Sequence, residues 1–489
     1  MNQARLWLFR AVGLSVFLSL PGCFPVAAQT LLGPGTTVTG RCFSHENEPG
    51  CVLPNLFGSG GLTLVPNPQF SHYAHYAGAA QDTLNQTLST AIATQLAVLP
   101  LISPSSGFTY KYDSSAGAFV RTTTSFGPIY TERAETIGRA KFAFGVSYQR
   151  FRFSSLDGID LHKIPAVFAH IPNTGPGDIP EPYEADVISS VNSVSLNLDQ
   201  TVLYATIGLT DRIDFSIAIP EVSVRMGAVS NATIVRVSGP TFIPTGATGP
   251  VIPNPHQFDS NGALNHVFTS DGNASGLGDM TFRIKGSIFQ RGALRVAGAF
   301  DLRTPTGDSR KFLGTGAVGI KPFVIVSLAR RFSPHLNMGY QWNGDSILAG
   351  NITGTTFGED SSDNVTIQNG PAIKKGLPGQ FFYSLGADYG ITPKLTFVAD
   401  YLGQVLIDAP RVIQGSTVTQ NVPGGTGALT LPTISGGKST FTLNNGAVGL
   451  KYNLFGGLLI TGDILFRMDD HGLRQNITPL VALSYAFGK

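Results

Sequence analysis

The stretch LLITGDILFRM, residues 458–468, places two charged residues, Asp463 and Arg467, inside a mainly apolar run. On an α-helix neither charge would have a polar face, whereas successive side chains of a β-strand point to opposite faces. A strand here has an apolar face of Leu458, Ile460, Ile464, Phe466 and Met468, and a polar face of Thr461, Asp463 and Arg467. The stretch therefore predicts a strand with one face suited to hydrocarbon and the other suited to water.

The same alternation recurs in eleven further stretches of the chain. These are residues 142–148, 191–208, 213–226, 280–288, 294–303, 317–328, 336–343, 381–389, 395–405, 443–454 and 477–487. Between them, short turns alternate with longer segments rich in Gly, Thr, Asn and Pro, near 155–187, 229–277, 345–378 and 407–438. Short turns at one end and long loops at the other are typical of outer-membrane barrels.

These patterns predict an all-β protein, a transmembrane antiparallel up-and-down β-barrel of about 12 strands. A count of 14 is the alternative, because residues 107–124 contain two further strand-like pieces. A soluble β-sandwich also has two-faced strands, but its outer face is usually rich in charged residues. Here the polar faces hold mostly Gly, Ser, Asn and isolated charges, which favours the barrel.

Composition agrees with a membrane barrel and argues against nucleic acid as a partner. Only 13% of the residues are charged, against roughly 25% in soluble domains. Beyond residue 28 no segment reaches the roughly 18 consecutive apolar residues of a spanning helix, so only a closed barrel would cross a bilayer. Without the two arginines of residues 1–28, the chain has 31 basic and 31 acidic residues, and therefore no basic excess for phosphates.

The N-terminal residues 1–28 are predicted to be a signal peptide. Arg5 and Arg10 precede the apolar stretch AVGLSVFLSL. The small residues Ala27 and Ala28 provide a cleavage site near Ala28. The alternative is lipoprotein processing, with Cys23 as the acylated residue. Export of a barrel predicts the outer membrane of a Gram-negative bacterium, with outer-membrane lipid, lipopolysaccharide and the outer-membrane assembly machinery as partners.

Residues 29–105 differ from the predicted barrel, residues 106–489. Cys42 and Cys51 are expected to form a disulfide in an oxidising compartment; a zinc site that adds His45 is the alternative. The spacing of Leu84, Leu88, Ile92, Leu96 and Leu99 predicts a helix near 79–99. This segment is expected to be a plug in the lumen or a periplasmic element.

Four motifs follow one another within residues 276–345: GLGDMTFRIKGSI, DLRTPTGD, GTGAVGIKPFVIVSLAR and NMGYQW. In these motifs the chain resembles the outer-membrane barrel family named for the meta-pathway of phenol degradation. The resemblance implies a channel associated with aromatic compounds and no catalytic residue. The motif residues are Gly276, Gly278, Asp279, Pro305, Gly307, Asp308 and Gly316.

The glycines of these motifs are expected where φ turns positive or a strand bends sharply. The two aspartates lie at the predicted boundaries between loops and strands, where a cation or neighbouring amides would satisfy their carboxylates.

Charged residues on the polar faces are the candidate solute path. Arg283, Lys285, Arg295 and Arg303 are expected to form a basic wall, opposite an acidic wall that includes Asp388 and Asp400. Two such walls would orient dipolar solutes. The alternative is an internal ladder of salt bridges that fills the lumen, with Asp301, Lys451, Asp463 and Arg467 as further members.

The predicted function is passive uptake of small hydrophobic or aromatic solutes through an outer-membrane channel, without cofactor or metal. A structural or adhesive barrel with a filled lumen is one alternative. A hydrolase is another, because Asp469, Asp470 and His471 lie together at the predicted rim. One local cluster is weak support for catalysis, which needs a second, facing group.

Overall fold

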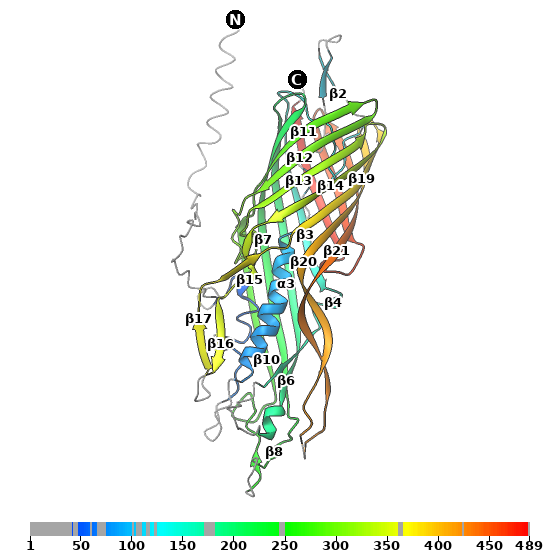
Figure 1. Ribbon diagram of the computed structural model, residues 1–489. Helices are drawn as coiled ribbons and strands as arrows, with labels where there is room; N and C mark the ends of the chain where they lie inside the picture. The colour runs from blue at the N-terminus through cyan, green and yellow to red at the C-terminus, as the bar shows by residue number, and fades with distance from the viewer. Residues whose placement is uncertain are drawn as a thin grey trace. The chain divides into compact units, whose positions relative to one another are not determined.

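The computed structural model describes residues 42, 47–58, 61–65, 75–99, 102–103, 110–113, 118–121, 125–170, 181–243, 250–359, 365–422 and 425–487 (Figure 1). The predicted signal peptide, with Cys23 and the cleavage site near Ala28, lies outside these residues, as does His45. None of the helices in the described ranges is long and apolar enough to span a membrane.

Twelve antiparallel strands close into a barrel within the described part of the chain. They are β3 (Phe142–Leu156), β6 (Val187–Gly208), β7 (Ile213–Val235), β11 (Thr281–Arg291), β12 (Leu294–Arg303), β13 (Gly319–Leu328), β14 (Phe332–Asn343), β19 (Gln380–Thr392), β20 (Leu395–Val418), β21 (Thr430–Phe455), β22 (Leu458–Arg467) and β24 (Ile477–Phe487). Each pairs with its neighbour in chain order, and β24 pairs with β3 to close the cylinder. The predicted 12-stranded barrel is therefore confirmed.

The two strand-like pieces before the barrel do not join it. β1 (Tyr110–Asp113) and β2 (Ala118–Arg121) pair only with each other in the described sheets, so the alternative count of 14 is wrong. The first wall strand begins at Phe142, so residues 106–141 precede the wall.

Further strands lie outside the closed wall. β4 (Ile159–Asp160), β5 (Ile164–Ala169), β10 (Asn265–Leu277) and β23 (Leu473–Gln475) pair with wall strands. Three small sheets contain β8 (Thr241–Phe242) with β9 (Ile252–Pro253), β15 (Asp345–Asn351) with β18 (Ile373–Gly376), and β16 (Thr355–Glu359) with β17 (Val365–Asn369). Much of the predicted loops 229–277 and 407–438 is therefore strand, because β7 pairs with β10, and β20 with β21, well beyond the predicted strand ends.

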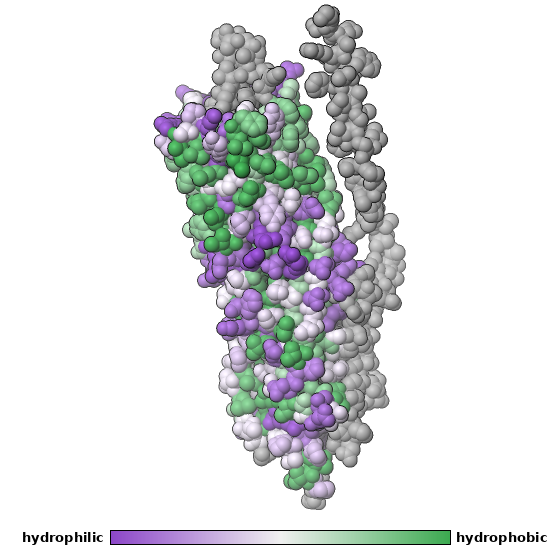
Figure 2. Space-filling view, turned by 180° about the vertical axis from the view of Figure 1, so that it is seen from behind, coloured by the Kyte–Doolittle hydropathy of each residue, from purple (hydrophilic) through white to green (hydrophobic). Residues whose placement is uncertain are grey.

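The short turns of the hairpins and the C-terminal end of β24 mark one end of the barrel, which is periplasmic by the usual arrangement of such barrels. In the adjoining half, apolar side chains face outward and are exposed. Examples are Phe144, Leu203, Phe381, Phe397, Leu450 and Leu483. Inward positions of the same strands hold buried polar residues such as Ser147, Thr206 and Asn337. This is the predicted transmembrane pattern, and Figure 2 shows hydrophobic side chains over the upper part of the molecule with a hydrophilic band below.

Beyond this membrane half, several strands continue into a region that we call the extension. It consists of residues 150–156 of β3, 187–199 of β6, 223–235 of β7, 407–418 of β20 and 430–439 of β21, together with β10. Here the two faces exchange character. Phe151, Phe153 and Leu196 point inward and are buried, whereas Arg152 and Arg225 point outward.

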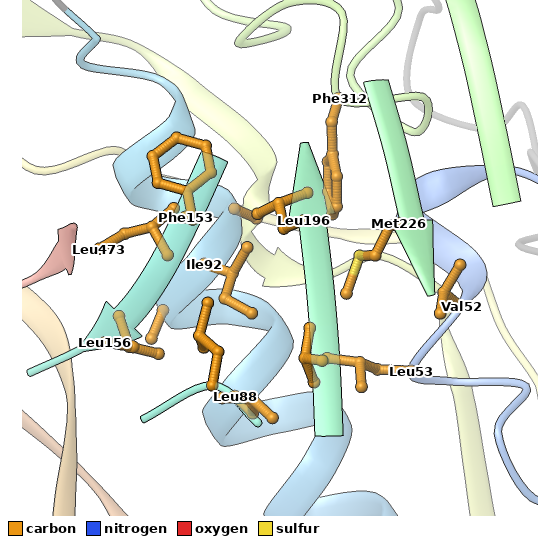
Figure 3. Packing of buried hydrophobic residues seen from close by; sticks show 14 of the residues in the cluster. Val52, Leu53, Leu88, Ile92, Phe153, Leu156, Leu196, Met226, Phe312 and Leu473 are labelled. Atoms are coloured by element: carbon orange, nitrogen blue, oxygen red, sulfur yellow. The ribbon is translucent and has the colours of Figure 1, made fainter. Parts of the chain in front are cut away.

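A helical stretch packs against this inward apolar face. It consists of α2 (Ala77–Gln81), the π-helical segment η3 (Asp82–Ser89) and α3 (Thr90–Leu96); short 3-10 turns η2 (Pro49–Cys51) and η4 (Pro182–Ala185) lie elsewhere. Leu88 and Ile92 are fully buried and point toward Phe153, Leu156 and Leu196 (Figure 3). Burying each such side chain contributes about 1.5–3 kcal/mol.

The predicted disulfide joins Cys42 to Cys51. The residues next to the disulfide contact the rest of the chain: Gly50 N donates to Arg310 O at 2.9 Å, and Asn273 N donates to Asn47 O at 2.9 Å. The N-terminal segment is thus anchored to the motif loop at 305–316 and to β10.

Candidate functional site

Residues 125–138, SFGPIYTERAETIG, cross the lumen of the membrane half as an irregular segment that we call the crosspiece. All fourteen residues are buried. Irregular backbone at membrane depth is tolerated only where protein groups satisfy it, and polar side chains of the wall do so here. The pairs are Phe126 N with Thr396 Oγ1 (3.1 Å), Ile129 N and Tyr130 N with Asp400 Oδ2 (3.1 and 3.0 Å), Glu132 N with Asn337 Oδ1 (2.6 Å), Ala134 N with Ser327 Oγ (3.0 Å) and Ile137 N with Asp214 Oδ2 (2.9 Å).

These partners show the course of the crosspiece. It runs from β20 past β14 and β13 to β7, which lie on different sides of the barrel. Thr396 and Asp214 are each the second residue of their strand, next to a short turn. The crosspiece therefore spans the lumen near the periplasmic end.

Two wall lysines bind carbonyl oxygens of the crosspiece. Lys285 Nζ donates to Arg133 O at 3.2 Å and to Glu135 O at 2.8 Å. On the other side of the lumen, Lys451 Nζ donates to Phe126 O at 3.3 Å and to Pro128 O at 2.6 Å. Both ammonium groups are almost fully buried. They fasten the crosspiece rather than face an open channel.

Glu132 of the crosspiece connects to an ion-pair row on the wall. Its Oε2 lies 2.6 Å from Arg283 Nη1 and its Oε1 lies 3.1 Å from Lys285 Nζ. Arg283 also binds both carboxylate oxygens of Asp301, at 2.6 and 2.8 Å, and Lys321 Nζ lies 3.0 Å from Asp301 Oδ2. A bidentate guanidinium–carboxylate pair of this kind is strong and directional.

The predicted acidic residues also have structural contacts. Asp388 Oδ1 bonds to His335 Nε2 at 2.5 Å, and the other ring nitrogen of His335 lies 2.8 Å from Ser327 Oγ. Asp400 accepts from the crosspiece, as described above. Asp463 is buried beside Gly449, and a Cβ on that glycine would contact both Asp463 and Ile129 of the crosspiece. The basic and acidic walls do not face each other across open water, because the crosspiece lies between them. That part of the two-wall interpretation is wrong.

Three predicted path residues lie apart from this network. Arg295 is at the periplasmic end, where its Nη1 donates to Gly292 O and Leu294 O. Arg467 is at the other end of the membrane half, where it bonds to Asp470 at 2.8 Å and to Ser155 Oγ at 3.1 Å. The structure does not place Arg295 in a cluster with Arg283, because the two residues lie at different heights on adjacent strands.

Arg303, the third, fastens the end of the helical stretch inside the lumen. Its Nη1 donates to Ala97 O at 3.0 Å, and Gln404 Nε2 donates to Val98 O at 3.2 Å. The last carbonyls of a helix have no helical partner and carry partial negative charge. A guanidinium and an amide from the wall satisfy them here.

A cavity of about 170 Å³ lies between this helix end and the crosspiece. We call it the chamber. Leu99 and Ile102 border it on one side, Tyr130 and Glu132 on another, and wall residues complete it. A cavity of about 150 Å³ can hold a benzene molecule, so the chamber has room for one small ring.

The wall of the chamber has a polar row and an aromatic row. The register brings the polar row together across β11, β12, β13, β14 and β19 as Arg283, Asp301, Lys321, Gln341 and Gln380. Two residues farther along, Phe323 and Phe382 flank Gly339, and their rings meet edge to face at 5.6 Å. A Cβ on Gly339 would lie 2.5 Å from that of Phe323, so this glycine permits the close approach.

The two aspartates of the motifs accept hydrogen bonds from neighbouring groups of the chain. Asp279 accepts from Gly307 N at 3.0 Å, from Thr315 N at 2.7 Å and from Thr315 Oγ1 at 2.5 Å, which fits the interpretation that amides satisfy it. Asp308 accepts from Arg310 N at 3.0 Å, and Pro305 is exposed.

The expectation of positive φ holds only for Gly316, at 66°. Neighbouring atoms approach Gly278 and Gly307 closely, because a Cβ would lie 3.0 and 2.7 Å from them, whereas at Gly276 a Cβ would lie 3.3 Å from the end of the flexible Leu313 side chain. Positive φ is excluded at these three positions, and the alternative of a sharp strand bend stays a prediction.

At the rim, Asp469 pairs with Arg474 and accepts from Asn444 N at 2.6 Å. Asp470 is bound to Arg467, and the ring of His471 lies 6.4 Å from that of Phe441. The carboxylates that a rim hydrolase would need are thus engaged with arginines.

Sequence reasoning missed the crosspiece, Lys321 and the two phenylalanines of the aromatic row. A signal for the crosspiece was present: residues 125–138 lack the two-residue alternation, yet contain Glu132, Arg133 and Glu135 directly before the first strand. Charges in such a stretch, attached to a membrane barrel, need partners inside it.

Comparison with known proteins gives a family match and distant structural likenesses. The model of the family described as "Putative MetA-pathway of phenol degradation" matches residues 199–422, a little under half of the chain. This range contains all four motifs, and the predicted resemblance is confirmed. A search of curated proteins found no match.

Three solved structures illustrate the structural likeness. An outer membrane channel from Pseudomonas putida F1 is 12% identical, with 72% of this chain and 98% of that chain covered and a TM-score of 0.39. The Ralstonia pickettii toluene transporter TbuX is 10% identical (73% and 92%, TM-score 0.31), and a Pseudomonas aeruginosa FadL homologue is 10% identical (78% and 99%, TM-score 0.29). At these scores the likeness carries no argument, and the fold rests on the strand pairing above.

Proposed function

With residues 199–422 matching that family, we propose that this chain is an outer-membrane channel for passive uptake of small hydrophobic or aromatic solutes. The observation that carries the proposal is the chamber, a cavity of about 170 Å³ with an aromatic row, inside a closed transmembrane barrel. Cofactor and metal have no part in it, and the surrounding lipid and lipopolysaccharide are its structural partners.

The proposed path has two closures in series. The first is the helical stretch, residues 77–96, whose end at Ala97 and Val98 is held by Arg303 and Gln404. The second is the crosspiece, fastened by Lys285 and Lys451. A solute leaves the chamber when one of these contacts opens, so we expect low and intermittent conductance rather than a permanently open pore.

A proteoliposome assay with p-cresol tests the channel. The wild-type protein should carry p-cresol across the bilayer faster than empty vesicles do. A variant that removes the fastening of the helix end, Arg303→Ala with Gln404→Ala, should be faster still. Equal rates for wild type, variant and empty vesicles would contradict the proposal.

The structural or adhesive barrel is the second candidate, because the crosspiece and the helical stretch occupy much of the lumen. It predicts no solute flux in either protein and loss of cell or surface attachment when the extension is removed. The contacts of Asp469 and Asp470 give no support to a rim hydrolase, and we assign no catalytic residue.

A further inference from the structure

The hydrogen bonds of the chamber wall have a fixed direction. Asn343 Nδ2 donates to Pro378 O at 2.7 Å, and a backbone carbonyl only accepts. Asn343 Oδ1 is therefore its acceptor end, and Gln341 Nε2 donates to it at 2.8 Å. Gln380 Nε2 in turn donates to Gln341 Oε1, also at 2.8 Å. This series of three hydrogen bonds ends at one atom, Gln380 Oε1.

That terminal oxygen is an acceptor for which the described residues provide no donor. Gln380 is 5% exposed and lines the chamber, and its Oε1 has no hydrogen-bond partner. A buried acceptor left in this state costs about 1–3 kcal/mol. The atom has almost no surface open to the chamber, so the Gln380 side chain has to turn toward the chamber for a solute O–H group to satisfy it.

Lys321 supplies the complementary donor. Its ammonium group has three N–H bonds, and its ion-pair partner is Asp301, at 3.0 Å. Its side chain is 26% exposed, on the wall of the chamber. By contrast, the guanidinium of Arg283 is committed to Asp301 and Glu132. Lys321 therefore has donors available for an oxygen of the solute.

The aromatic row fixes the remainder of the solute. Lys321 Nζ lies 5.6 Å from the ring centroid of Phe323 and 5.0 Å from that of Phe382. The two rows are two residues apart along the strands, about 6.6 Å at the usual rise. An oxygen held at the polar row thus leaves a directly attached ring against the two phenylalanines.

We propose that the chamber is a selectivity site for single-ring aromatic solutes that carry a hydroxyl group, which accepts from Lys321 and donates to Gln380. The inference rests on the proposed channel for its biological meaning, but binding itself needs no transport. It predicts discrimination against hydrocarbons and ethers of the same size, because neither donates a hydrogen bond to Gln380 Oε1.

Calorimetric titration of the full-length protein in detergent tests this with three probes: p-cresol, 4-methylanisole and toluene. Wild type should bind p-cresol about tenfold or more tightly than 4-methylanisole, which has the oxygen but not the proton. Gln380→Met should remove this difference by weakening p-cresol alone. Lys321→Met should weaken both oxygen-containing probes and leave toluene unchanged.

Gln414→Met is the matched control, because Gln414 is exposed on the extension, and it should bind as wild type. The heat-dependent gel shift of a folded barrel establishes that each variant folds. Equal binding of p-cresol and 4-methylanisole by wild type, or an unchanged preference in Gln380→Met, would overturn the selectivity site even if p-cresol flux is observed. Selective binding without flux would instead overturn the channel and leave the site.

Discussion

The membrane half and the extension are built from the same strands, yet their inner and outer faces have opposite character. On β3, the exposed Phe144 and Tyr148 point outward in the membrane half, and the buried Ser147 and Gln149 point inward. A few residues on, Phe151 and Phe153 point inward and are buried, while the exposed Arg152 points outward. The strand never breaks; only the parity of its apolar residues changes.

The comparison shows that the solvent outside each half sets the pattern. Next to hydrocarbon, the apolar face must be outside, and polar groups inside have to satisfy one another. Next to water, the same wall folds like a soluble protein, with an apolar interior covered by a helix. Two different kinds of interior therefore occur in one wall, one held by ion pairs and the other by apolar packing.

The largest effect is expected from breaking the polar interior at Glu132. In Glu132→Gln, Arg283 and Lys285 stay buried but lose a charged partner. We expect the free energy of unfolding to fall by about 3–5 kcal/mol. The free energy of unfolding in urea and hydrogen exchange of residues 125–138 measure it.

Glu221→Gln is the control, because Glu221 is exposed on the outer face. The same loss of stability in both variants would show that the position inside the lumen is irrelevant. Such a result would remove the ion-pair half of the comparison.

The apolar interior of the extension is tested by Ile92→Ala. Ile92 is fully buried against the strands, and the substitution should cost about 2–5 kcal/mol through lost burial and a cavity. The loss should be local: hydrogen exchange should speed up over residues 77–96 while β22 and β24 stay protected. Thr83→Ala, on a half-buried position of the same stretch, should change exchange much less.

The barrel and its outer apolar face could be predicted from sequence, because alternation is a local property of each strand. The exchange of the two faces is also visible locally in FGVSYQRFRF, residues 144–153. The apolar side chains stand at even-numbered positions 144, 146 and 148 and then at odd-numbered positions 151 and 153. The predicted strand at 142–148 ends at Tyr148 and so does not include the residues at which the parity changes.

The chamber could not have been predicted in the same way. Its polar row comes from five strands, and the register that aligns Lys321 with Gln341 and Gln380 depends on turns and bulges across residues 281–392. Alternation assigns each of these side chains to the inner face but does not say which of them meet. The crosspiece, which has no repeat of its own, is positioned by the side chains of the wall that it contacts.

The outer faces of the membrane half and of the extension are compared by placing one lysine on each. Leu483 is exposed at the middle of β24, between Val146 and Ile460 on the neighbouring strands. Leu483→Lys should cost about 2–4 kcal/mol in lipid, whereas Ser195→Lys, exposed on the extension, should stay within about 0.5 kcal/mol. Unfolding titrations in lipid vesicles measure both. Equal costs would mean that the two outer faces meet the same solvent.

The smallest effect is expected from pH, at a buried cluster that links Tyr76, at the start of the helical stretch, to Asp186, the residue directly before the extension part of β6. His256 bonds to Asp186 at 3.0 Å through Nδ1 and to Tyr76 Oη at 3.3 Å, and its ring lies 5.3 Å from that of His170. His75 stacks on His170 at 4.4 Å, and the guanidinium of Arg236 donates to the backbone carbonyl of His256. The ring of Tyr183 also lies 5.7 Å from that of His256. Within the described residues, these charged and titratable groups surround the ring.

Burial is the largest influence and lowers the pKa of His256; the hydrogen bond and the charge of Asp186 oppose it, and the charges of His75 and Arg236 add to the lowering. The unfolded chain therefore takes up a proton near pH 6.5 while the folded cluster still excludes it. Stability is full above that pH and decreases as pH falls below it. Hydrogen exchange of residues 75–99 should consequently be faster at pH 5.5 than at pH 7.5.

The variant His256→Gln should reduce that pH dependence, and His266→Gln, at an exposed histidine of β10, should keep it. A response limited to residues 75–99 would mean that protons loosen the extension without disturbing the membrane half, as expected if the two interiors are stabilised independently. Equal acceleration of exchange in β22 and β24 would instead show that acid acts on the whole barrel, and the separation of the two halves would fail.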